Sequence, residues 1–87
     1  MKITMTEKDR CILFLKQNGW NENEWTTDDM FSVYHKKDHY NVFIGDKELL
    51  IVEGVSIIEG LPVNYFALVG VLLEYRQIDG ISFFKKY

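Results

Sequence analysis

The sequence predicts an α+β domain of order α-β-β-β-α, in which a three-stranded antiparallel meander lies between two helices along the chain. Two observations carry this prediction. Apolar side chains recur at helical spacing over residues 7–18 and again over residues 62–77. Between them, residues 30–53 hold three short runs with the apolar alternation or continuity of strands. Both helices are expected to pack on one face of the sheet, because each has a single apolar face to bury.

The first helix is expected over residues 7–18. Thr6 is a suitable N-cap, and Asp9, three residues further on, can complete a capping box. Gly19 is expected to end the helix, since glycine adopts the left-handed conformation of a helix C-terminus at little cost. Trp20 then follows the cap, at the position that packs back on the last helical turn in a Schellman ending.

A polar loop follows over residues 21–28, interrupted by Trp25. Segment 21–29 (NENEWTTDD) contains four acids and no base. The acids are Glu22, Glu24, Asp28 and Asp29. They are interpreted first as a solvated surface, and together with Trp25 they are a candidate contact for a basic protein partner. Trp25 itself is interpreted as a lid over the edge of the core, with an exposed contact as the alternative.

Three strands are predicted at Met30–Lys36, His39–Ile44 and Glu48–Glu53. The first two alternate, which indicates one buried and one exposed face, whereas ELLIVE in the third is nearly continuous and indicates deeper burial. Gly45-Asp46 fits a tight primed turn between the second and third strands. Residues 54–60 (GVSIIEG) are interpreted as a connecting segment, with a short extended piece as an alternative.

The second helix is expected to extend to Gln77, with Pro62 in its first turn or Asn64 as an alternative cap. Its bulky apolar arc is formed by Tyr65, Phe66, Leu68, Val69, Leu72 and Leu73. Its smooth arc includes Ala67, Gly70 and Val71. Small residues allow close approach, so this arc is a candidate contact for the first helix or for a second copy of the chain. Residues 81–87 (ISFFKKY) are a candidate short fourth strand.

Both histidines lie in segment 35–41 (HKKDHYN), between two predicted strands. A hairpin turn there accounts for the charged residues, and His35 shares the alternation of the apolar side chains that precede it. A metal site would have to use His35, His39 and Asp38 without a fourth ligand nearby, so no metal and no cofactor are predicted. Catalysis through His39 is a minor candidate, because no nucleophile or orienting carboxylate accompanies it.

Three segments resemble the HicA toxins, small RNA-cleaving proteins with a fold like that of double-stranded-RNA-binding domains. They are LKQNGW (15–20), KKDHYNVF (36–43) and DKELLIVEGVSIIEG (46–60). The resemblance implies RNA cleavage with His39 as the catalytic histidine. The chain has Lys37-Asp38 where that family usually has Gly-Ser before the histidine.

Length and charge bound the class of partner. The 87 residues suffice for one domain, so residues 1–87 are assigned to a single unit. The formal net charge of −3 argues against nucleic acid, since proteins that neutralise many phosphates carry a basic excess. An acidic inhibitor of a nucleic-acid-binding protein, in which carboxylates replace phosphates, is one alternative function.

Cysteine usage and hydropathy indicate the compartment. Cys11 is the only cysteine, which excludes an internal disulfide and a zinc site built from paired thiolates. Residues 1–10 lack the apolar core of a signal peptide, and no stretch reaches the ~18–20 apolar residues of a membrane span. We therefore expect a cytoplasmic, non-enzymatic protein–protein interaction module without membrane contact, with homodimerisation as a candidate property.

Overall fold

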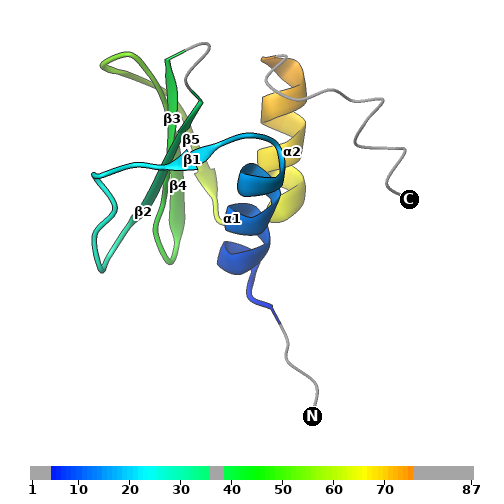
Figure 1. Cartoon of the computed structure of the whole chain (residues 1–87). Helices are drawn as coiled ribbons and strands as arrows, with labels where there is room; N and C mark the ends of the chain where they lie inside the picture. Colours follow the sequence, from blue (N-terminus) through cyan, green and yellow to red (C-terminus); the bar gives the residue numbers. More distant parts are fainter. Residues whose placement is uncertain (1–4, 36–38, 76–87) are drawn as a thin grey trace.

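The computed structural model describes residues 5–35 and 39–75, which form two helices and a five-stranded antiparallel sheet (Figure 1). The elements are α1 (Glu7–Gln17), β1 (Asn21–Glu22), β2 (Phe31–His35), β3 (Tyr40–Ile44), β4 (Glu48–Glu53), β5 (Ser56–Pro62) and α2 (Tyr65–Glu74). The strand order is β1-β2-β3-β4-β5, so each strand pairs with its neighbour in the chain. The α+β class is confirmed, whereas the prediction of three strands is wrong because β1 and β5 extend the sheet on both sides.

Both helices lie on the same side of the sheet (Figure 1). The core between the two layers is apolar and contains Cys11, Phe14, Leu15, Trp20, Val33, Tyr40, Val42, Ile44, Leu49, Ile51, Tyr65, Leu68, Val69 and Leu72. On β3 the buried residues are every second one, Tyr40, Val42 and Ile44, as the alternation predicts. Strand β4 also alternates in burial, so the deeper burial predicted for ELLIVE is wrong. One face of the sheet is therefore covered by helices.

The two ends of α1 are set by local hydrogen bonds that the sequence predicts. The hydroxyl of Thr6 accepts a bond of 3.1 Å from the Asp9 amide, and the Thr6 amide donates to the Asp9 carboxylate at 3.4 Å. This reciprocal pair is a capping box. At the other end, the Trp20 amide donates to the carbonyl of Leu15 at 3.0 Å, and Gly19 takes a φ of 88°. The predicted Schellman ending is confirmed, and Trp20 is buried in the core.

The start of α2 is set by the alternative cap. The side chain of Asn64 accepts a hydrogen bond of 3.0 Å from the Ala67 amide, and the helix begins at Tyr65. Pro62 ends β5, so its predicted place in the first helical turn is wrong. Phe66 is 69% exposed, against the expectation that it is buried. The arc that contacts the sheet and α1 is narrower than the apolar arc, and Phe66 lies at its margin.

Two further predictions about the connections are wrong. Most of segment 54–60, interpreted as a connection, belongs to β5 and pairs with β4. The turn at Gly45-Asp46 is not primed, because neither of these two residues has the positive φ that a primed turn requires. The predicted end of the second helix at Gln77 and the candidate strand at 81–87 lie outside the described residues.

The N-terminal turns of the two helices are joined through Glu7. Its carboxylate accepts a hydrogen bond of 2.9 Å from the Tyr65 amide and pairs with Arg10 at 3.1 Å. The bond from the Tyr65 backbone is the main cause that lowers the pKa of Glu7, and Arg10 adds to it. Cys11 lies buried nearby, and burial raises the pKa of its thiol to about 11.

We expect Glu7→Gln to reduce the acid sensitivity of the fold. The pKa of Glu7 is lower in the folded state, so its stabilisation is present above the unfolded value of 4.5 and is lost as pH falls through the folded pKa. Urea unfolding at several pH values should show a smaller loss of stability below about pH 4.5 in this variant than in the wild type. Glu74→Gln, on the exposed side of α2, is the control. Identical pH profiles for the wild type and Glu7→Gln would contradict the assignment.

Gly70→Ala should raise the free energy of unfolding by about 1 kcal/mol, because alanine is the better helix former. A methyl group added at Gly70 would meet no described atom within 4 Å. Chemical denaturation at low protein concentration measures the change. A loss of stability that depends on protein concentration would instead show that a second copy of the chain approaches α2 at this residue.

Candidate functional site

The sheet face opposite the helices carries a second row of side chains, which we call the outer face. It is formed by Tyr34, Asn41, Phe43, Leu50, Val52 and Ile57. The register places Tyr34 opposite Asn41, Phe43 opposite Leu50 and Val52 opposite Ile57. Residues directly opposite in antiparallel strands point to the same face, so these pairs are in contact range. Their neighbours along each strand point into the core.

The loop between β1 and β2 is held against the outer face by hydrogen bonds from its own side chains. The hydroxyl of Thr26 accepts from the Ser32 amide at 2.9 Å and donates to the Ser32 carbonyl at 3.0 Å. The side-chain amide of Asn23 donates to Asn41 at 2.8 Å, and its oxygen accepts from the Trp25 amide at 3.2 Å. These bonds close the loop and determine where Trp25 lies.

Trp25 lies flat on the outer face. Its ring stacks on the ring of Phe43, with centroids 6.2 Å apart and planes 9° from parallel. Trp25 nevertheless remains 55% exposed. The indole therefore covers Phe43 on the far side of the sheet and does not cover the edge of the core. Its fixed position and its exposure together make it a preorganised contact.

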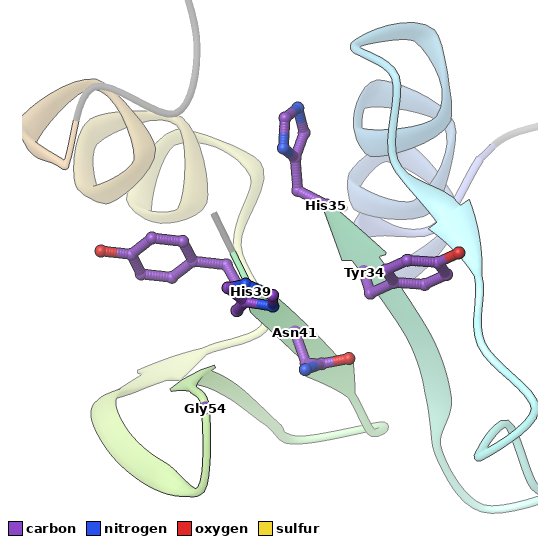
Figure 2. Close-up of a pocket in the computed structure, with 6 residues that line it drawn as sticks. Tyr34, His35, His39, Asn41 and Gly54 are labelled. Carbon is purple, nitrogen blue, oxygen red and sulfur yellow. The ribbon is translucent and has the colours of Figure 1, made fainter. Parts of the chain in front are cut away.

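Two hollows lie side by side, the larger on the outer face and the smaller at the ends of β2 and β3, where residues from both faces of the sheet line it. The larger, of about 440 Å³, is lined by Glu22, Asn23, Glu24, Trp25, Tyr34 and Asn41. The smaller, of about 250 Å³ and shown in Figure 2, is lined by Tyr34, His35, His39, Tyr40, Asn41 and Gly54. Tyr34 and Asn41 belong to both hollows and form the boundary between them. The lining residues named here include two carboxylates and no lysine or arginine.

The four acids of the predicted acidic patch lie in different surroundings in the structure. Glu22 lies on β1, and its carboxylate is 3.8 Å from the ammonium group of Lys16 on α1. Glu24 is exposed, lines the larger hollow and has no ion pair within residues 5–35 and 39–75. Asp28 and Asp29 are also exposed, further along the loop. Glu24 is thus the acid that the fold brings to the hollow without neutralising it.

Both histidines line the smaller hollow, but the imidazole of His35 is directed away from the outer face. His35 lies on the core side of β2, where its ring is 5.3 Å from that of Trp20, and its Nδ1 is buried with no hydrogen-bond partner in the described structure. Figure 2 shows its imidazole directed toward the helices, whereas Asn41 points to the opposite side of the sheet. His39 is exposed, and its carbonyl accepts from the Gly54 amide at 3.0 Å. The residues between the two histidines lie outside the described part.

Two other candidates, a metal site and the smooth arc of α2, do not form a cluster of functional side chains among the described residues. Among residues 5–35 and 39–75, no group of three or more His, Cys, Asp or Glu side chains is placed to hold a metal ion. Gly70 is exposed and has open space around it, so it does not receive α1. Ala67 is half-buried, and Val71 packs partly against the core. The predicted self-association through this arc stays a prediction.

Sequence reasoning named Trp25 and Glu24 but missed the three residues that surround them. Tyr34, Asn41 and Phe43 come from neighbouring strands, and only the pairing register brings them to the loop.

Neither described helix is long and apolar enough to cross a membrane. Comparisons of the chain with protein families, with curated proteins and with solved structures find no match. The chemistry of the outer face is therefore the basis for a functional proposal.

We expect His39→Gly to raise the free energy of unfolding by about 1 kcal/mol, because the φ of 58° at this residue strains any side chain that has a Cβ. His39→Ala keeps the Cβ and should give no such gain, which makes it the matched control. Denaturant unfolding of the three proteins measures the difference. A glycine variant less stable than the alanine variant would show that the imidazole itself stabilises the fold.

Proposed function

We propose that this chain is a non-enzymatic protein-binding module that engages its partner with the outer face of the sheet. The observation that carries the proposal is a continuous apolar stripe across β3, β4 and β5. Trp25 and Ile57, at the two ends of the stripe, are 55% and 64% exposed. Phe43, Leu50 and Val52 lie between them and are half-buried. Contiguous exposed apolar patches of this kind mark interaction sites.

The construction of the stripe favours binding. Its aromatic anchor is already ordered, because Trp25 is stacked on Phe43 and its amide is bonded to Asn23. A partner that packs on a fixed indole pays little conformational entropy at that contact. Tryptophan is also among the residues most often found to dominate the energy of protein interfaces.

Charge favours a protein over a nucleic acid as the partner. Aromatic side chains on a sheet can stack on bases, but single-strand binding also requires a positively charged groove for the phosphates. The hollows beside the stripe are lined by Glu22 and Glu24 and by no described lysine or arginine. The net charge of −3 adds a general repulsion of polyanions.

Three alternatives stay predictions, one of them the acidic inhibitor of a nucleic-acid-binding protein. RNA cleavage through His39, which the resemblance to the HicA toxins implies, needs a second acid–base group. His35, the other imidazole of its hollow, is directed toward the helices (Figure 2). Self-association through α2 would use Phe66, which is exposed, together with the open surface at Gly70. Neither RNA cleavage nor self-association through α2 uses the apolar stripe.

Ile57→Lys should abolish capture of a partner that the wild-type chain retains from its native host, since the lysine places a charge within the stripe. Leu13→Lys is the matched control, because Leu13 is also exposed but lies on α1, on the opposite side of the molecule. Both variants should keep the wild-type circular dichroism spectrum. If Leu13→Lys loses the partner and Ile57→Lys keeps it, the interface lies on the helices and the proposal is wrong.

A further inference from the structure

We propose that the larger hollow is a binding site for an arginine side chain of the partner, whose guanidinium packs against the indole of Trp25 and pairs with the carboxylate of Glu24. This inference rests on the proposed function, because it names the chemistry of the protein segment that the outer face accepts. It also identifies the residues that would make the module selective for a basic partner.

The walls of the hollow suit a flat cation. Trp25 and Tyr34 supply two aromatic rings, and Glu24 supplies a negative charge within the same lining. The amide side chains of Asn23 and Asn41 are bonded to each other at 2.8 Å, which fixes the polar wall between the rings. The hollow, of about 440 Å³, is open to solvent and has room for one guanidinium group.

The negative charge around the larger hollow favours a cation as the bound group. Of the two carboxylates in the lining, that of Glu22 is already paired with Lys16, whereas Glu24 has no ion pair among the described residues. Asp28 and Asp29 lie exposed on the same loop and add negative potential without a described counter-charge. A phosphate or carboxylate would be repelled there, and an arginine would gain from both the aromatic faces and the acid.

The chain already contains this type of contact at the half-exposed N-terminal turns of its two helices. The guanidinium of Arg10 lies 4.5 Å from the ring centroid of Tyr65 and pairs with Glu7 at 3.1 Å. A second ring, that of Phe66, lies 5.8 Å from the same guanidinium, so two aromatic rings and one carboxylate surround Arg10 as they would the arginine in the hollow. Arginine is favoured over lysine because its planar, weakly hydrated group can stack on a ring and donate to a carboxylate at once.

Titration with a hexa-arginine peptide tests the inference on the full chain. The protein has two indole N–H groups, that of the buried Trp20 and that of the exposed Trp25, which nuclear magnetic resonance separates. We expect the Trp25 signal to shift and that of Trp20 to stay in place. A hexa-citrulline peptide has the same shape without the charge, and it should bind at least about tenfold more weakly.

Two charge reversals distinguish a site from a general attraction. Glu24→Lys should weaken hexa-arginine binding about tenfold or more, whereas Glu74→Lys, the same change of charge on α2, should weaken it less than about twofold. Equal weakening by both variants, equal binding of citrulline, or no shift of the Trp25 signal would each overturn the arginine site. The capture experiment with Ile57→Lys does not depend on arginine, so the proposed function can survive that failure.

Discussion

The outer face depends on the contact between the hydroxyl of Thr26 and the backbone of Ser32. The hydroxyl accepts from the Ser32 amide and donates to its carbonyl, at 2.9 and 3.0 Å, and thereby satisfies both backbone polar groups of a fully buried residue. Strand β1 has only two residues and is too short to orient the loop alone. The two hydrogen bonds of the Thr26 hydroxyl therefore direct the chain across the sheet and place Trp25 over Phe43.

The two tryptophans, five residues apart, show how the fold separates its two faces. Trp20 follows the Schellman ending of α1, is 2% exposed and packs in the core beneath the helices. Trp25 lies beyond β1, on the other side of the sheet, and remains more than half exposed. The helices supply enough apolar surface to close one face of a small sheet, and the other face is left with its own apolar side chains. In a chain of this size, an apolar face that no described helix covers is expected to have a partner.

The sequence predicts those elements whose signals are local, such as the helix caps and the alternation on β3. Strand β5 is not predicted because a register shift opposite β4 breaks the period of two: Ile58 packs on the core, and the next residue, Glu59, lies opposite the buried Ile51. Trp25 could be named as a contact from its acidic surroundings alone. Asn41 and Phe43 could not, because they reach it only through the pairing register of β2 with β3, which the sequence does not state.

The most direct test of the account is whether the ring of Trp25 lies on the ring of Phe43 in solution. Nuclear Overhauser effects between the two side chains, measured on the full chain, report this distance without a partner present. The account predicts clear cross-peaks between the rings, together with ring-current shifts of the Phe43 protons. Absence of these cross-peaks, with Trp25 at the chemical shifts of an unstructured peptide, would contradict a preorganised outer face.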